Sequence, residues 1–444
     1  MVLPPPPGAR KVRKHLSADA MYALLGKSFA EIADHRQPDP PIPLRDALLS
    51  AFAMFALKDP SLLAFDQRRS DANMKAVFGI ERIPSDTQMR EILDPLDPES
   101  LRPVFNDVFR QLQRGKALEP LVFYQGHYLL ALDGTGYFSS QKIHCPSCQV
   151  KEHMNGTVTY EHQTLGAVIV HPDFKEVIPL APEPIQKQDG STKNDCERNA
   201  ARRLLAKIRR EHPHLQLIVV EDGLASNGPH LRDLIEHEMR FLLGVKPGDH
   251  EFLFAQVETA RREGRSPKLT KKEGGITREV SWVWDVPLNE ANQDLRVNFL
   301  EYREVDAEGK CLKKFAWVTD LHVTHRTAWW FARGGRTRWH IENETFNTLK
   351  NQGYHYEHNY GHGQENLSVV FAMLMMLAFL VDQTQQLCCP LFRAVWKKVG
   401  SKRALWEQLR SHFVHFRFRS MRQLYEVMLY DLAKEVPLPT LDTS

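Results

Sequence analysis

Cysteine is scarce in this chain, which has 6 cysteines among 444 residues. So few cysteines in so long a chain exclude a disulfide framework, which is typical of small secreted domains. Long hydrophobic runs are also absent: the longest, residues 369–381, has 13 residues, whereas a membrane-spanning helix needs about 20. The N-terminus is rich in proline and basic residues and lacks the apolar segment of a signal peptide. We therefore expect a cytoplasmic protein with no membrane partner, and a buried core helix at 369–381.

Net charge is small as well, at +3, so the total says nothing about a polyanionic partner. The distribution is uneven, because residues 393–422 contain nine Lys or Arg side chains and a single acid, Glu407. Residues 257–278 contain seven basic and three acidic side chains. A local excess of positive charge is what a nucleic-acid surface needs. A solvated helix face has the same pattern, and both interpretations stay open.

The chain is long enough for two or three domains, and it has no evident internal repeat. Composition and periodicity divide it into a flexible Pro-rich arm (1–43), a helical domain (44–120), the first part of an α/β core (121–249), a β-rich insertion (250–330), core helices (331–383) and a basic helical tail (384–444). The α/β core is predicted as strands at 127–132, 165–170 and 177–180, a helix at 193–210, a strand at 217–220, a helix at 231–238 and a strand at 240–245. Several α/β folds share this order.

The helical domain contains a candidate DNA-binding motif. Ser85, with Gln88 three residues later, predicts a capping box at a helix start. The preceding helix, a turn at Gly79 and this second helix together fit a helix-turn-helix. Since any small helical bundle has such turns, packing without DNA contact is the alternative.

Two aspartates have the same context, because Asp133 and Asp222 each close an apolar strand and are each followed by glycine. A carboxylate at a strand end points into the crevice where an open sheet binds ligands. The glycine allows a sharp turn and the close approach of a phosphate. A third acid, Glu342, is predicted on a helix at 337–351, on the same face as Arg338. The separations are 222 − 133 = 89 and 342 − 222 = 120 residues, so only a fold can bring these acids together.

Three converging carboxylates repel one another, which makes them poor at stabilising a fold. They are good ligands for Mg²⁺, which prefers oxygen, and two such ions support an in-line displacement at phosphorus. Taken singly, Asp133 and Asp222 are also explained as turn residues, since Asp-Gly is a common turn. Together with Glu342 they favour a metal site.

The segment from Arg338 to Lys350 resembles the third-acid helix of insertion-sequence DDE transposases of bacteria, in the branch with a Tyr-Arg-Glu-Lys signature. The sequences around Asp133 and Asp222, residues 84–90 and residues 353–363 are similar to that family too. The resemblance therefore extends over residues 44–383. It implies an RNase H-like catalytic core with a β-rich insertion, between an N-terminal helical domain and a C-terminal helical tail.

The resemblance also implies a site and a reaction. Asp133, Asp222 and Glu342 would hold two Mg²⁺ (or Mn²⁺) ions, and Arg338 and Lys350 would contact DNA phosphate. The implied reaction is cleavage at the transposon ends, followed by strand transfer into target DNA. The implied partners are the inverted repeats at those ends, the target DNA and a second copy of the chain, in a homodimer or larger complex associated with the nucleoid.

The sequence departs from the family signature at two positions. Gly335 stands where the signature has tyrosine, and Lys350 lies eight residues after Glu342, one further than the signature has it. This spacing leaves Glu344 as the alternative third acid. Two other functions also stay open: a metal-dependent DNA nuclease without strand transfer, and a non-catalytic DNA-binding protein derived from a transposase. The three intact acids argue against the second.

A further metal site is indicated by Cys145 and Cys148, a Cys-x-x-Cys pair with His153 and His162 downstream. This pattern is part of a zinc site, with His162 or His144 as the fourth ligand. The chain has no second Cys-x-x-Cys. A β-hairpin turn with reduced cysteines and a redox pair are the alternatives, and His162 would then line the active site.

Overall fold

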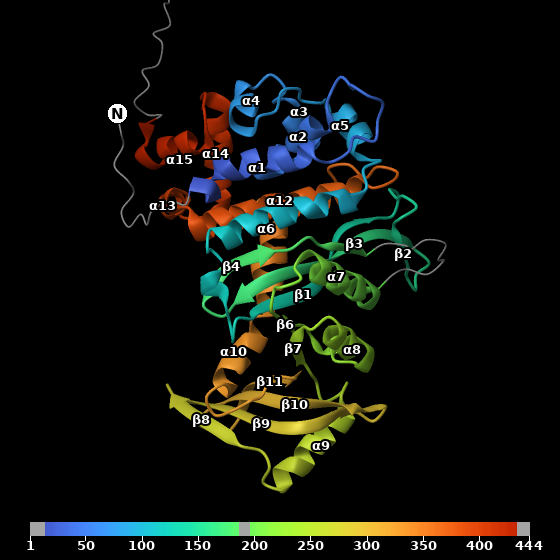
Figure 1. The fold of residues 1–444 in the computed structure, drawn as a ribbon, viewed down its shortest axis with the longest axis vertical. Coiled ribbons are helices and arrows are strands. Elements are labelled where there is room, and N and C mark those ends of the chain that lie inside the picture. Colours follow the sequence, from blue (N-terminus) through green and yellow to red (C-terminus); the bar gives the residue numbers. More distant parts are fainter. Residues whose placement is uncertain (1–13, 186–195, 433–444) are drawn as a thin grey trace, which may run out of the picture.

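The computed structural model describes residues 14–185 and 196–432. The protein is a mixed α/β structure, elongated, with helices at one end, a mixed sheet across the middle and more strands at the other end (Figure 1). The strands are β1 (Tyr128–Ser140), β2 (Gln149–Glu152), β3 (Val158–His171), β4 (Phe174–Pro179), β5 (Glu183–Ile185), β6 (Leu217–Val220), β7 (Arg240–Gly244), β8 (Lys268–Glu273), β9 (Ile276–Asn289), β10 (Asn292–Val305) and β11 (Cys311–Thr319). The helices are α1 (Ala18–Ala30), α2 (Leu44–Ala56), α3 (Leu62–Asp66), α4 (Ala72–Phe78), α5 (Asp86–Leu93), α6 (Arg102–Arg114), α7 (Glu197–Glu211), α8 (Gly228–Glu236), α9 (Glu251–Arg262), α10 (Ala328–Arg336), a π-helix η5 (Ile341–Phe346), α11 (Asn347–Asn351), α12 (Leu367–Cys388), α13 (Pro390–Val399), α14 (Lys402–His415) and α15 (Met421–Tyr430).

The sheet has the strand order β2-β3-β1-β6-β7-β11-β10-β9-β8, and β4 and β5 also pair with β3. Strand β1 is antiparallel to β3 and parallel to β6, which is parallel to β7. The first half of β1 and the whole of β6 are buried, which explains their uninterrupted apolar runs. Strand β11 pairs antiparallel with β7. The predicted β-rich insertion therefore continues the central sheet.

The elements from β1 to β7 follow the predicted order of three strands, a helix, a strand, a helix and a strand, with β2 and β5 as short additions. Helix α7 buries the predicted apolar face, which includes Leu204, Leu205 and Ile208. Helix α9 was not predicted, because the segment after 250 was taken as strands. Its Leu253, Val257 and Ala260 are buried at helical spacing.

The prediction of a flexible arm at 1–43 is wrong for α1. Met21, Leu25 and Phe29 of this helix are completely buried, and α1 contacts α2, α6 and α15. Only residues 1–13 of the predicted arm lie outside the described residues. After α12, helices α14 and α15 pack back onto the N-terminal helices (Figure 1), with Phe413 of α14 against Phe78 of α4 and with α15 against α1. The aromatic side chains of the predicted tail therefore pack within the chain itself.

The predicted capping box is confirmed at the start of α5. The Ser85 hydroxyl accepts from the Gln88 N–H, and the Gln88 side chain accepts from the Ser85 N–H. Gly79, which ends α4, has the left-handed conformation that favours glycine (φ +70°). DNA contact by α4 and α5 remains a prediction.

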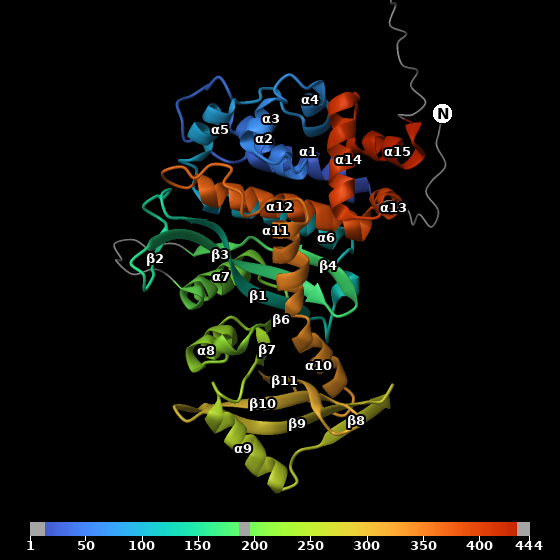
Figure 2. The same ribbon diagram turned by 180° about the vertical axis from the view of Figure 1, so that it is seen from behind.

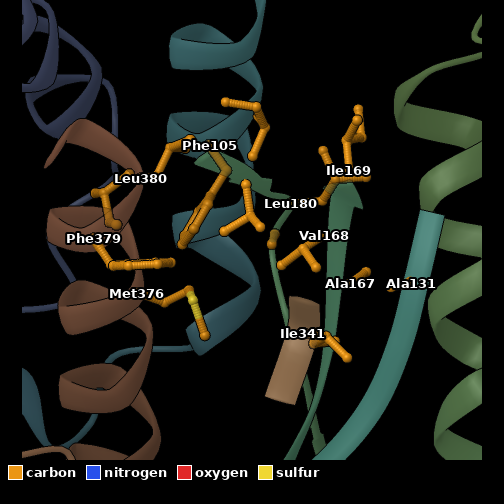
Figure 3. Close-up of a cluster of buried hydrophobic side chains, with 14 of the residues drawn as sticks. Phe105, Ala131, Ala167, Val168, Ile169, Leu180, Ile341, Met376, Phe379 and Leu380 are labelled. Atoms are coloured by element: carbon orange, nitrogen blue, oxygen red, sulfur yellow. The ribbon is translucent and has the colours of Figure 1, made fainter. Parts of the chain in front are cut away.

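Helix α12 is the core helix predicted at 369–381, but it is longer than the apolar run, at 22 residues. By length and composition alone it is able to cross a membrane, and 94% of its most apolar window is buried inside the protein. It lies with α6 over one face of the sheet, where Met376 and Phe379 meet Phe105, Val168 and Leu180 (Figure 3). Burial, and not length, therefore identifies it as a core helix.

Candidate functional site

Asp133 and Asp222 occupy equivalent places on neighbouring strands. The parallel pairing of β1 with β6 runs from Tyr128 opposite Leu217 to Ala131 opposite Val220, an offset of 89 residues. The same offset separates the two aspartates, so each follows the last paired residue by two positions. Neighbouring strands lie about 4.8 Å apart. The register therefore places Asp133 and Asp222 at the same level of neighbouring strands, just beyond the carboxyl end of the parallel pair.

The prediction that Asp133 ends its strand is wrong, because β1 continues to Ser140 along its other neighbour, β3. Asp133 stands where the pairing with β6 stops and the pairing with β3 continues, opposite Gly166. Asp222 does follow the end of β6. One of its oxygens caps the short turn after it, by accepting the Leu224 N–H at 2.9 Å.

Glu342 reaches the same place from a distant part of the chain. The helix predicted at 337–351 is confirmed from residue 339 onward: after a turn at 337–338 the chain is helical to Asn351, with the π-helix η5 in the middle and α11 at the end. The guanidinium of Arg338 lies between two acids, with Nη1 3.1 Å from Asp133 Oδ2 and Nη2 2.6 Å from Glu342 Oε1. Asp133 and Glu342 are thus brought within the reach of one side chain. Short π-helices of this kind are frequent at functional sites.

Gly166 allows η5 to approach the sheet. A Cβ atom at this position would lie 3.0 Å from Phe346 Cζ and 3.5 Å from Ile341 Cδ1. Ile341 and Phe346 are the buried apolar side chains at the two ends of η5, and Ile341 points toward β3 (Figure 3). Gly166 is paired with Asp133. The space at Gly166 that admits η5 therefore lies next to Asp133, which shares Arg338 with Glu342 of η5.

A fourth carboxylate, Glu197, lies close to the site and was missed in the sequence. It is the first residue of α7, which covers the sheet face opposite to α10 and α11 (Figures 1 and 2). A Cβ atom at Gly134 would lie 2.1 Å from Glu197 Oε1, so the glycine after Asp133 makes room for this carboxylate and not for a turn. Acids are common in the first turn of a helix, where the helix dipole favours them. The sequence therefore gave no reason to select Glu197 as a site residue.

These carboxylates perturb one another. Burial raises the pKa of Asp133 to about 7; the charge of Arg338 opposes this shift, and the charges of Glu342 and Glu197 add to it. Burial also raises the pKa of Glu197, with contributions from Asp222 and Glu221. The cluster thus holds more negative charge than its single arginine neutralises, which is the electrostatic condition for binding a cation.

Glu344, the alternative third acid, and Lys350, the predicted phosphate ligand, lie in surroundings that differ from those of Glu342. Burial lowers the pKa values of His340 and of Lys402 of α14, and the charge of Glu344 opposes both shifts. Lys350, predicted to bind phosphate, forms an ion pair with Glu357 at 2.8 Å. It is not among the residues that line the cavity next to the acids.

The signature position occupied by Gly335 has a local explanation. A Cβ atom there would lie 2.4 Å from Cε2 of the Trp317 ring, so β11 fills the space that a side chain at 335 would need.

A cavity of 610 Å³ opens beside Asp222, Arg338 and Glu342. It lies between the ends of β6 and β7 on one side and α10 and β11 on the other. Its basic lining residues are Lys246, Lys314, Arg336 and Arg338, its acidic ones are Glu221, Asp222 and Glu342, and its aromatic ones are Phe254, Phe315, Trp317 and Trp339. A cavity with acids at one side and cations around it suits an anionic ligand that is held together with a cation.

The cysteine pair lies apart from this cavity. Cys145 and Cys148 are buried beside His162, and the structure adds His362, which the sequence did not indicate. His153 is not in this group, because it is exposed and its ring contacts the Thr159 hydroxyl at 2.7 Å. The group could hold a metal ion such as zinc.

Carboxylates gathered at a sheet edge are hard oxygen ligands, which suit Mg²⁺ or Mn²⁺. No model of a known protein family matches the sequence, and no curated protein matches it either.

Proposed function

We propose that this protein is a DNA transposase that uses divalent metal ions, with Asp133, Asp222 and Glu342 as its catalytic acids. One observation carries the proposal: acids separated by 89 and 120 residues lie at one sheet edge, two of them held by Arg338. Burial, with smaller contributions from the charges of Glu342 and Glu197, raises the pKa of Asp133 to about 7. A purely structural role gives no reason to gather like charges around a buried carboxylate.

The fold supports the same proposal. Strands β1, β3 and β4 form an antiparallel meander, and β6 and β7 follow in parallel beside β1, with α7 and α8 between them in the chain. An RNase H-like core has this order, with its acids on the first strand, after the fourth strand and on a later helix. Asp133, Asp222 and Glu342 have these places.

The donor atoms at the site fit Mg²⁺ or Mn²⁺. Asp133, Asp222 and Glu342 would hold the ions, and Glu197 is near enough to add negative charge. Two bound ions would activate the attacking oxygen and stabilise the leaving one. Ion pairs with Arg338 hold the Asp133 and Glu342 carboxylates in place, so these two acids are positioned by another side chain of the protein.

DNA is the substrate that the cavity favours. Lys246, Lys314 and Arg336 line the same cavity as Asp222 and Glu342, on the side of β7 and β11, where phosphate oxygens adjacent to the cleaved bond would lie. Transposition requires two DNA ends to be brought together, so the proposal includes a dimer or larger assembly. A nuclease without strand transfer has the same site and differs only in its products.

The test is a reaction of the purified protein with linear DNA that carries the sequences flanking its own gene. With Mg²⁺ and a supercoiled plasmid as target, we expect cleavage at fixed positions and joining of the new 3′ ends to the plasmid. Cleavage without joining would assign the nuclease. Binding of this DNA without cleavage in either Mg²⁺ or Mn²⁺ would contradict an enzymatic role.

Gly166 provides a test of how Glu342 is positioned. We expect Gly166→Val to push Phe346 and η5 away from the sheet and to reduce cleavage about 100-fold, because a misplacement of about 1 Å is enough for such a loss. Overpacking costs about 1–3 kcal/mol of folding stability, so the variant should remain folded. The matched control is Gly136→Val on β1, whose nearest neighbours are 4.0 Å away. Full activity of Gly166→Val would show that another contact holds η5.

A further inference from the structure

We propose that Cys145, Cys148, His162 and His362 form a structural zinc site, separate from the three acids. The ligands come from three parts of the chain. The cysteines lie in the loop between β1 and β2, His162 lies on β3, and His362 lies in the loop between α11 and α12. That last loop passes over the β2–β3 end of the sheet (Figure 1).

The distances between the donor atoms fit a tetrahedron. With Zn–S of about 2.3 Å and Zn–N of about 2.0–2.1 Å, a regular tetrahedron has S–S edges of about 3.8 Å and S–N edges of about 3.6 Å. The Sγ atoms of Cys145 and Cys148 are 3.8 Å apart. Nε2 of His162 is 3.4 and 3.5 Å from them, and Nε2 of His362 is 3.4 Å from Cys148 Sγ. All four donor atoms lie within 4.8 Å of one another.

The donor set indicates which metal is bound and in what role. Two thiolates and two imidazoles in tetrahedral geometry are a zinc set, whereas Mg²⁺ requires oxygen ligands. All four side chains are buried, with exposed fractions between 1% and 7%. Four protein ligands leave no open position for water or substrate, and this is the difference between a structural zinc ion and a catalytic one.

Neither alternative for the cysteines accounts for the two histidine nitrogens directed at their sulfurs. A disulfide has an S–S distance of about 2.05 Å, and the two thiols are free and 3.8 Å apart. A hairpin turn requires only the residues near the turn. It gives no reason for His362, 214 residues after Cys148, to direct Nε2 at its sulfur.

The expected role of the ion is to fasten the segment after Glu342. The chain leaves η5, passes through α11 and the loop with His362, and then enters the core helix α12. A zinc ion bound by His362, by the two cysteines of the β1–β2 loop and by His162 of β3 would fix this loop on the sheet that carries Asp133. Phe138, five residues after Asp133 on β1, packs against the His362 ring with their centroids 4.3 Å apart.

Metal analysis of the full-length protein tests the inference directly. Protein purified without chelators should contain about one zinc ion per chain, and a mercurial reagent that blocks thiols should release it. Protein prepared with Co²⁺ should show the visible bands of a tetrahedral site and thiolate-to-cobalt charge transfer. Neither readout needs a variant or any enzymatic activity.

Matched variants locate the ligands. Cys148→Ser and His362→Ala should each lower the zinc content by at least about tenfold, since each removes one of four ligands. The controls are Cys196→Ser, at an exposed cysteine outside the group, and His153→Ala, at the nearby histidine that contacts Thr159; both should retain one zinc ion. Asp133→Asn should also retain it, which separates this site from the acids.

Two results would overturn the inference. One is wild-type protein from zinc-supplemented medium that contains no zinc and shows no thiolate-to-cobalt bands. The other is a Cys145–Cys148 disulfide, found by mass spectrometry in protein that binds no metal, which would assign the pair to redox chemistry.

Discussion

Asp133→Asn or Asp222→Asn should reduce DNA cleavage by roughly a thousand-fold or more, while DNA binding changes little. A bound cation supplies several kcal/mol of transition-state stabilisation, and 1.36 kcal/mol corresponds to a factor of ten in rate. Asparagine keeps the shape of the side chain but removes the charge that holds the ion. Affinity for DNA depends mainly on basic side chains at phosphates, which these changes leave in place.

The effect is measured with DNA carrying the gene's flanking sequences, by cleavage in Mg²⁺ and by binding in Ca²⁺ without turnover. Asp294→Asn is the matched control, because this exposed acid forms a surface ion pair with Arg232 near the β9–β10 turn. Cleavage at close to the wild-type rate by either active-site variant would remove that residue from the mechanism. Loss of binding in parallel with cleavage would indicate a folding defect.

The second large effect distinguishes Glu342 from Glu344. Glu342→Gln should lose cleavage and strand transfer by a similar factor, because its carboxylate lies with Asp133 around Arg338. Glu344→Gln should stay within a few-fold of the wild type. Its charge acts on His340 and Lys402, whereas the charge of Glu342 acts on Asp133.

Each glutamine variant serves as the control for the other, since the two residues share one short π-helix and the same substitution. Both should be assayed in Mg²⁺ and in Mn²⁺, which tolerates a weakened ligand set better. An active Glu342→Gln together with an inactive Glu344→Gln would reverse the assignment of the third acid.

Local patterns predicted much of the core. The runs of apolar residues in β1 and β6 are uninterrupted because both faces of the strands are buried there, and such runs can be recognised in the sequence alone. The capping box at Ser85 and the buried face of α7 are likewise properties of a few neighbouring residues. Predictions failed where a local pattern is compatible with two structures. The Pro-rich N-terminal segment was predicted to be flexible, although it contains α1, which buries Phe29 in the core.

Sequence alone indicated that Asp133 and Asp222 are equivalent, because each follows an apolar run and precedes glycine. Only the tertiary structure decided what surrounds them. Glu197 fills the space above Gly134, η5 docks on Gly166, and His362 joins the cysteines, through contacts between residues that are far apart in the chain. Periodicity encodes which face of an element is buried, but not which distant side chain will cover it. The ligand sets of both sites depend on that second kind of information.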